Sequence, residues 1–180
     1  MICRLFTEDN KSRTYQHENA VFLLRHAMLA AYGVHYDEKN IVLNPYGKPS
    51  LGEHPEIQYN ISHCMGCVAA IIDDAGHEVG IDVEKIRPFS ESVAKRVLSS
   101  AELSFLKNSA DPERDFFRFW VLKESYVKAL GLGIGFGLRN IAFSWDEKLN
   151  IRSTCENASF RLIEDVPGYI LGACILHQNK

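Results

Sequence analysis

Apolar residues recur at helical spacing in two long stretches of the chain. The first, HENAVFLLRHAMLAAYG, covers residues 17–33 and ends on a glycine, a common stop signal for a helix. The second covers residues 112–130 and is closed by Gly131. A shorter helix is expected to open at SSAEL, where Ser99 and Glu102 have the spacing of a capping box. These patterns predict two long helices and a short one.

Short apolar runs between turn residues predict strands. IQYNIS and CVAAII pair around a turn at Met65 and Gly66, and EVGIDVEK follows as a third strand. Beyond the second long helix, NIAFSW, LNIRS, SFRLIE and YILGACIL are predicted to be strands of a second sheet. The segment NPYGKPSL between the first helix and these strands is expected to be a loop, because Pro45, Gly47 and Pro49 interrupt it.

Both parts of the chain therefore have the same predicted order, a helix followed by a small antiparallel sheet. The strand–turn–strand layout of YNISHCMGCVAAII returns in FRLIEDVPGYILGACIL, which indicates a weak internal duplication. We predict an α+β fold with pseudo-twofold symmetry, an N-terminal half at residues 1–77 and a C-terminal half at residues 78–180. No linker rich in Pro, Gly or Ser separates them, so we expect one compact unit with the functional site between the halves.

Composition and charge limit the class of protein. The 180 residues are 46% hydrophobic with a formal net charge of -3, which is too close to neutral to favour a nucleic-acid binder. No apolar run reaches the ~18 residues that cross a bilayer, and no signal peptide is recognised, so we expect a soluble cytoplasmic protein. Cys64 and Cys67 form a CxxC pair, but no second pair or histidine cluster completes a zinc site. They are interpreted as ordinary thiols.

The strand VGIDVEK places two acids, Asp82 and Glu84, among apolar residues. Side chains alternate along a strand, so both carboxylates point to the same face. An exposed strand would explain them, but the flanking strands are almost wholly apolar, so this strand is expected to be central. Two like charges on a partly buried face repel each other, and a divalent cation such as Mg²⁺ would remove the conflict.

The second long helix carries Trp120, Glu124 and Lys128 at positions i, i+4 and i+8, on one face. A surface Glu–Lys pair is the simpler interpretation, but Trp120 indicates that this face packs against protein. Glu124 would then need a cation and Lys128 an anion, while Lys123, one position away, could reach a phosphate from the side. Carboxylates for a metal and ammonium groups for phosphate together predict chemistry at a pyrophosphate.

Two polar segments and one glycine run complete the candidates. Ser62 and His63 end a strand in NISHC, although a lone histidine is more often structural, and Lys48 lies in a rigid Gly-Lys-Pro loop of a kind that is most often a simple turn. The glycines of GLGIGFGL follow a helix, whereas a dinucleotide fingerprint follows a strand and opens a helix. Gly131 is therefore predicted to cap the helix, and the rest of the run is expected to be a flexible turn.

With these motifs assembled, the chain resembles the 4′-phosphopantetheinyl transferases, in particular the larger, monomeric type that activates nonribosomal peptide and polyketide synthetases. The family's Gly-hydrophobic-Asp-x-Glu strand corresponds to residues 80–84, and its Trp-x-x-Lys-Glu-[Ser/Ala]-x-x-Lys helix to residues 120–128. Its Gly-Lys-Pro and Asn-x-Ser-His elements appear in order as GKP and NISH. The resemblance covers about residues 11–145.

The resemblance implies Mg²⁺-dependent transfer of the 4′-phosphopantetheine arm of coenzyme A to a serine of an acidic apo acyl or peptidyl carrier protein, with release of 3′,5′-ADP, in antibiotic or lipid biosynthesis. It implies a monomer that binds neither nucleic acid nor membrane. It also implies that Asp82, Glu84 and Glu124 hold the Mg²⁺, for which Mn²⁺ could substitute. The implied catalytic residues are Glu124, which accepts the serine proton, Lys128 and His63. The implied coenzyme contacts are Lys48, Pro49, Ser62, His63, Asp82 and Lys128.

Relatives carry basic side chains for the 3′-phosphate of the coenzyme in a longer segment before the first helix. Here Arg4, Lys11 and Arg13 occupy that region, and none is assigned. A basic patch after the acidic strand is expected to receive the carrier beside an exposed Phe89; its members are Lys85, Arg87, Lys95 and Arg96. A solvated helix face would explain the same charges.

Two other hypotheses stay open. A non-catalytic coenzyme A or carrier-binding module would not need three acids together with Lys128. A different Mg²⁺-dependent phosphate enzyme, such as a nucleotide hydrolase, would be expected to show a P-loop or kinase signature, and none is present.

Overall fold

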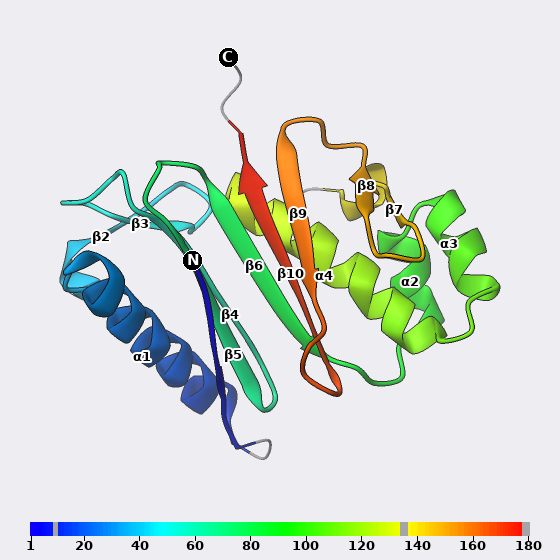
Figure 1. The fold of residues 1–180 in the computed structure, drawn as a ribbon, viewed down its shortest axis with the longest axis horizontal. Helices are drawn as coiled ribbons and strands as arrows, with labels where there is room; N and C mark the ends of the chain where they lie inside the picture. The colour runs from blue at the N-terminus through cyan, green and yellow to red at the C-terminus, as the bar shows by residue number, and fades with distance from the viewer. Residues whose placement is uncertain (9–10, 134–136, 178–180) are drawn as a thin grey trace.

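The computed structural model describes residues 1–8, 11–133 and 137–177, and it has the predicted α+β architecture (Figure 1). The N-terminal half contains β1 (Ile2–Phe6), α1 (Arg13–Tyr32), β2 (Ile41–Leu43), β3 (Pro49–Leu51), β4 (Gln58–Cys64) and β5 (Cys67–Asp73). The C-terminal half contains β6 (Val79–Lys85), α2 (Glu91–Val97), α3 (Ser100–Lys107), α4 (Pro112–Leu130), β7 (Phe143–Trp145), β8 (Ile151–Ser153), β9 (Ala158–Ile163) and β10 (Tyr169–Leu176). Two short 3₁₀ turns lie at Glu38–Asn40 and Leu138–Asn140.

Two three-stranded antiparallel sheets form the centre of the molecule, with strand orders β1-β5-β4 and β6-β10-β9. In each, a strand is followed by a long helix and then by a hairpin whose second strand is central. Helix α1 covers the first sheet and α4 the second (Figure 1). The hairpin correspondence is as predicted, but the predicted order, helix first, is wrong. The short strand β1 precedes α1, and β6 is its counterpart in the second sheet rather than a third strand of the first.

The ends of the long helices follow from local chemistry. The side chain of Ser12 accepts a hydrogen bond from the backbone N–H of Tyr15 at the start of α1. Asp111 does the same for Arg114 at the start of α4, and Gly131 ends that helix in the left-handed conformation with φ of 65°. The capping box of α3 is also confirmed.

Three elements differ from the sequence-based prediction. The segment NPYGKPSL is the tip and second strand of the hairpin β2–β3 rather than a loop throughout. Strands β7 and β8 pair only with each other and do not join the second sheet. Helix α2 was not predicted. The remainder of the glycine run includes residues 134–136, which lie outside the described residues.

The two sheets meet where β4 runs beside β6 in the same direction. The backbone of β6 is hydrogen-bonded there to side chains of β4 instead of to its backbone. The N–H of Ile81 donates to Asn60 Oδ1 at 3.0 Å, and the N–H of Val83 donates to Ser62 Oγ at 3.3 Å. The acidic strand is therefore covered on both edges, by β4 and by β10, and its expected central position is confirmed.

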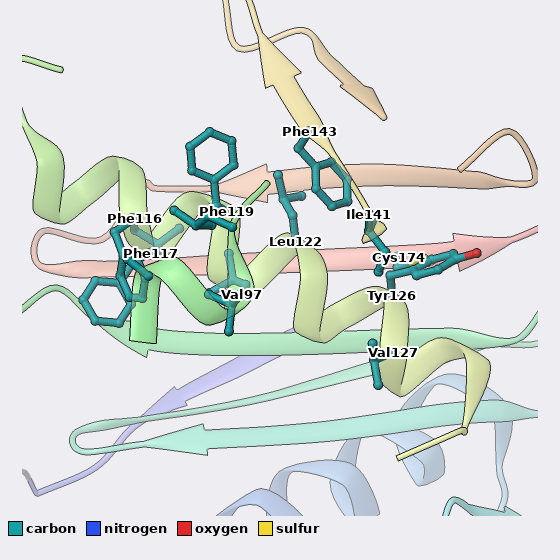
Figure 2. Close-up of a cluster of buried hydrophobic side chains, with 14 of the residues drawn as sticks. Val97, Phe116, Phe117, Phe119, Leu122, Tyr126, Val127, Ile141, Phe143 and Cys174 are labelled. Atoms are coloured by element: carbon teal, nitrogen blue, oxygen red, sulfur yellow. The ribbon is translucent and has the colours of Figure 1, made fainter. Parts of the chain in front are cut away.

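Helix α4 lies directly on the second sheet because two glycines leave room for its backbone. A Cβ atom on Gly80 would lie 2.0 Å from the carbonyl oxygen of Ser125, and one on Gly172 would lie 2.5 Å from that of Val121. Helix α4 also forms the centre of a large apolar cluster that extends from Cys174 on β10 to Val97 on α2 and Phe143 on β7 (Figure 2). Gly80 of the acidic motif thus brings Asp82 close to α4.

Within the described residues, no helix combines the length and the hydropathy that a membrane span requires. The boundary between residues 77 and 78 falls in the connection between β5 and β6. That the two halves are domains in their own right stays a prediction.

Candidate active site between β6 and α4

A pocket of about 280 Å³ opens where the hairpin β2–β3, strand β4 and the C-terminal part of α4 come together. Residues from three separate sequence motifs reach it. Its lining consists of Tyr46, Gly47, Lys48, Pro49, Asn60, Glu124, Val127, Lys128, Gly131 and Gly133. The Gly-Lys-Pro loop and the Trp-x-x-Lys-Glu helix, about eighty residues apart in the chain, therefore form one surface.

The acidic strand joins this pocket through Lys128. Its ammonium group donates to Asp82 Oδ1 at 2.6 Å, to Ser62 Oγ at 2.9 Å and to the carbonyl oxygen of Ile81 at 3.1 Å. Ser62 Oγ in turn donates to Asp82 Oδ1 at 2.9 Å. Three of the predicted site residues, Ser62, Asp82 and Lys128, are thus joined by hydrogen bonds, and Glu124 lines the same pocket as Lys128.

Burial and a neighbouring acid raise the pKa of both Glu84 and Glu124. Burial raises the pKa of Glu84, and the nearby Asp82 raises it further, although Arg87 lowers it through a hydrogen bond of 2.8 Å. Burial also raises the pKa of Glu124, as do Asp82 and Glu84, and only Lys128 opposes them. The cluster therefore has an excess of buried negative charge.

A divalent cation suits this donor set. Asp82 is buried, with 6% of its surface exposed, and its Oδ2 atom has no hydrogen-bond partner among the described residues. A buried carboxylate oxygen without a partner is costly, and hard cations such as Mg²⁺ bind carboxylate oxygens. However, no group of three or more His, Cys, Asp or Glu side chains in the described part of the chain is arranged so that it could hold a metal ion. The three-carboxylate metal site stays a prediction.

Lys48 holds the hairpin against the end of α4. Its ammonium group pairs with Glu78 and donates to the carbonyl oxygen of Ala129 at 2.6 Å, and the side chain of Asn44 donates to the carbonyl of Gly131 at 2.9 Å. Lys48 therefore has two partners within the protein and also lines the pocket beside Pro49. Sequence inspection gave no indication of its pairing with Glu78.

His63 lies at the edge of the site rather than in the pocket. Its ring packs against that of His17 on α1, with centroids 5.8 Å apart. Burial lowers the pKa of His63, and the positive charges of Arg13 and Lys128 add to that effect, so the neutral imidazole is favoured. Of the three basic residues near the N-terminus, Arg13 lies near enough to lower the pKa of this histidine through its charge, whereas Arg4 pairs with Asp165 and Lys11 pairs with Glu8 at 3.4 Å.

The expectation that Lys123 reaches a phosphate is wrong. Its side chain is fully buried on the other side of α4 and pairs with Glu102 at 2.8 Å. Burial lowers the pKa of Lys123 and Glu102 opposes this. One residue that sequence reasoning left out, Asn60, both lines the pocket and binds the backbone of β6. Its alternation with Ser62 on one strand face was the signal that could have found it.

Buried acids beside an ammonium group, at the mouth of a pocket lined by lysines, define a site for phosphate chemistry. A family model described as the 4′-phosphopantetheinyl transferase superfamily matches residues 78–174, which include both signature motifs. The chain is 29% identical over 163 residues to the 4′-phosphopantetheinyl transferase Sfp of Bacillus subtilis (strain 168). It is 34% identical over 163 residues to another 4′-phosphopantetheinyl transferase of Bacillus subtilis. Each alignment covers 87% of this chain and 72% of the relative.

The crystal structure of Thermotoga maritima holo-[acyl-carrier-protein] synthase gives a TM-score of 0.49 at 22% identity, over 57% of this chain and 64% of that one, which is too low to add to the assignment. The sequence matches are sufficient. The chain belongs to the 4′-phosphopantetheinyl transferase superfamily and is a transferase of that class. The resemblance drawn from the four motifs is therefore confirmed.

Proposed function

We propose that this enzyme transfers the 4′-phosphopantetheine arm of coenzyme A to a serine of an apo carrier protein, with Mg²⁺ as the activating ion and 3′,5′-ADP as the second product. The observation that supports this most is the convergence of Lys48, Pro49, Glu124 and Lys128 in one pocket, with Asp82 hydrogen-bonded to Lys128 at its edge. Membership of the family supports the type of reaction.

The reaction forms one bond and breaks another at the same phosphorus. The carrier serine oxygen bonds to the phosphorus that carries the pantetheine arm, and the bond from that phosphorus to the bridging oxygen of the pyrophosphate breaks, with the electron pair leaving on 3′,5′-ADP. Such a displacement needs positioning and neutralisation of charge more than covalent chemistry. Lys48 and Lys128 would supply the positive charge, and Ser62 and His63 would donate to phosphate oxygens.

Glu124 is the proposed proton acceptor. Its raised pKa makes it a stronger base than an ordinary glutamate, and its position in the pocket gives it access to an incoming hydroxyl. Asp82, Glu84 and Glu124 would hold the Mg²⁺, and Mn²⁺ would accept the same oxygen ligands. When bound, the ion supplies charge neutralisation for the pyrophosphate. Arg13, whose charge acts on His63, is proposed to bind the 3′-phosphate.

An acidic carrier is proposed to dock next to α2. Lys95 and Arg96 are exposed there, and a groove of about 400 Å³ between α2, α3 and the start of α4 is lined by Phe89, Leu103 and Leu106 with lysines at its rim. Phe89 is half-buried and stacks on Phe116 with centroids 4.4 Å apart, so it forms a wall of the groove rather than the exposed contact that the sequence indicated. An apolar groove with a cationic rim suits an amphipathic acidic helix.

Incubation of the protein with coenzyme A, Mg²⁺ and a panel of apo carrier proteins tests the proposal. We expect a carrier whose intact mass rises by one phosphopantetheine group, with release of 3′,5′-ADP. Coenzyme A binding without a mass change on any carrier would support the binding-module hypothesis instead. Release of phosphate or nucleotide without a carrier would support a hydrolase.

Asp82→Ala is the matched negative variant, and Asp115→Ala is its control. Both acids are buried to a similar degree, with 6% and 7% exposed, but Asp115 pairs with Arg118 far from the pocket. Loss of transfer in Asp82→Ala alone would support the site, and equal losses would indicate general destabilisation.

The monomeric state and a cytoplasmic location also stay predictions, the first of which light scattering would test.

A further inference from the structure

We propose that Lys123 and Glu102 are positioning residues that set the rotation of α4 and so aim Glu124 and Lys128 at Asp82. This inference rests on the proposed function of that site. Lys123 is next to Glu124 in the chain, but its side chain is fully buried and reaches Glu102 and the carbonyl oxygen of Leu138 rather than the pocket. Neither residue of the pair lines the pocket.

The ammonium group of Lys123 is held at three points. It pairs with Glu102 Oε2 at 2.8 Å, donates to the carbonyl oxygen of Leu138 at 3.0 Å and donates to that of Ile141. An ammonium group has three donors, so all of them are used. Lys123 therefore joins the middle of α4 to the segment that follows it in the chain.

Glu102 is held just as completely from the other side. Its Oε2 atom accepts from the N–H of Ser99 at 2.7 Å, as part of the α3 capping box, and its Oε1 atom accepts from the N–H of Phe143 at 2.9 Å. The side chains of Glu102 and Lys123 are 1% and 0% exposed. The pair thus connects α3, α4 and β7 at one point.

This anchor acts on the pocket through α4 itself. On the pocket side, Glu124 lies among like charges, and Lys128 donates to Ser62 on β4 and to Asp82 and the carbonyl oxygen of Ile81 on β6. The close approach of α4 to Gly80 and Gly172 fixes which backbone atoms of the helix face the sheet, and the Lys123–Glu102 pair adds a directional polar restraint at another position around the helix axis. A rotation that moves Glu124 by about 1 Å can lower a rate by ~10²-fold.

A stabilising contact without influence on the site would give a different result from a positioning contact. Replacing both members of a buried ion pair by neutral residues is often tolerated by the fold, whereas removing one member is not. We therefore compare the single variant Lys123→Met with the double variant Lys123→Met/Glu102→Gln, which keeps a side-chain oxygen at the α3 cap. Glu164→Gln is the control, because it removes an ion pair between α4 and the β9–β10 turn at Arg118.

Calorimetry, coenzyme A titration and steady-state kinetics are measured for each variant. We expect the double variant to fold with a Tm between those of the single variant and the wild type, because no charge is left buried alone although one backbone N–H facing Glu102 loses its acceptor. It should bind coenzyme A with unchanged affinity, yet show kcat lowered by about 10–100-fold at nearly constant KM for the coenzyme. Wild-type kcat in the folded double variant, or an equal kcat loss in Glu164→Gln, would overturn the inference. An inactive wild type would contradict the proposed function instead, so the two failures are distinguishable.

Discussion

Two charged clusters lie on opposite sides of α4, and they differ in how well their charges are compensated. On one side, Lys123 and Glu102 have a partner for each donor and each carboxylate oxygen, and almost none of their surface is exposed. On the other, three acids share Lys128 and Arg87, and Asp82 Oδ2 has no partner among the described residues. One helix thus carries, within two turns, an ion pair whose charges are fully compensated and a cluster of acids whose charges are not.

This difference distinguishes buried charges that stabilise the fold from buried charges that lack a partner and are available to bind a ligand. A buried ion pair is tolerated when all its hydrogen-bonding capacity is used. Carboxylates that raise one another's pKa cost stability, and such clusters are candidates for function because a ligand can supply the missing charge. The first three predictions below test this contrast, and the fourth tests the proposed docking surface.

The largest effect is expected for Glu124→Gln, which should lower kcat by about 10²–10⁴-fold because the proton acceptor is lost. The same change should raise Tm. Since the folded pKa of Glu124 is raised, the folded state disfavours its charged form, and stability falls as pH rises through that pKa. At pH 7.5 the neutral amide avoids this loss of stability, and a gain of about 1 kcal/mol in unfolding free energy would raise Tm by ~2–4 °C.

Glu164→Gln is a control for which scanning calorimetry should show a change in Tm of the opposite sign to that of Glu124→Gln. Burial raises the pKa of Glu164, but its bonds to Arg118 and Arg114 lower it on balance, so the charged form is favoured in the fold. That contribution to stability is present above the unfolded pKa and is lost as pH falls. Glu164→Gln should therefore lower Tm at pH 7.5. A lower Tm in both variants would contradict the contrast between the clusters.

The next largest effect is expected for the Lys123–Glu102 pair. Lys123→Ala should destabilise the protein by about 3–5 kcal/mol, because it leaves the buried carboxylate of Glu102 without its cation. Denaturant unfolding measures this loss. A cost below about 1 kcal/mol, as is typical of exposed pairs such as Lys95–Glu91, would show that the Lys123–Glu102 pair does not hold the fold.

A smaller effect is expected for Lys128→Met in the absence of coenzyme A. Lys128 neutralises Asp82 in the structure, so it competes with a divalent cation for that carboxylate. Removing it should tighten Mn²⁺ binding by about 3–10-fold although transfer activity falls. Calorimetric titration with Mn²⁺ measures the affinity. Lys48→Met is the control, because Lys48 lines the same pocket but pairs with Glu78. Weaker Mn²⁺ binding in Lys128→Met would contradict the competition.

The smallest effect is expected at the proposed docking surface. Reversing Lys95 and Arg96 to Glu should raise KM for an acidic carrier by about 5–20-fold through loss of electrostatic attraction, with coenzyme A affinity unchanged. The shift should shrink as salt is added. If the reversal weakened coenzyme A affinity as much as it raised KM for the carrier, the patch would not be specific for the carrier. Reversal of Lys107, at the rim of the same groove, extends the test.

Much of the site could be predicted because its residues follow local periodicity. Alternation along β6 places Asp82 and Glu84 on one face, and the four-residue spacing on α4 aligns Trp120, Glu124 and Lys128. The helix boundaries at residues 112–130 followed from a proline at the start and a glycine at the end. The hairpins β4–β5 and β9–β10 were recognised for the same reason, since a turn between two apolar runs is a local feature.

Contacts between distant segments could not be predicted in this way. Local spacing separates Lys123 from the face that carries Lys128, but it does not indicate that Lys123 pairs with Glu102 or that Lys128 contacts Asp82, because those partners come from segments packed against different sides of α4. The pairing of Lys48 with Glu78 and the membership of β6 in the second sheet are of the same kind.

The sequence by itself determined the α+β class, the two long helices, the family and the residues that gather at the site, because spacing along a helix or strand is set by backbone geometry. Only the tertiary structure decided which charges are compensated. The energy of a buried charge depends on every neighbour that folding brings within a few ångströms, and those neighbours come from segments far apart in the chain.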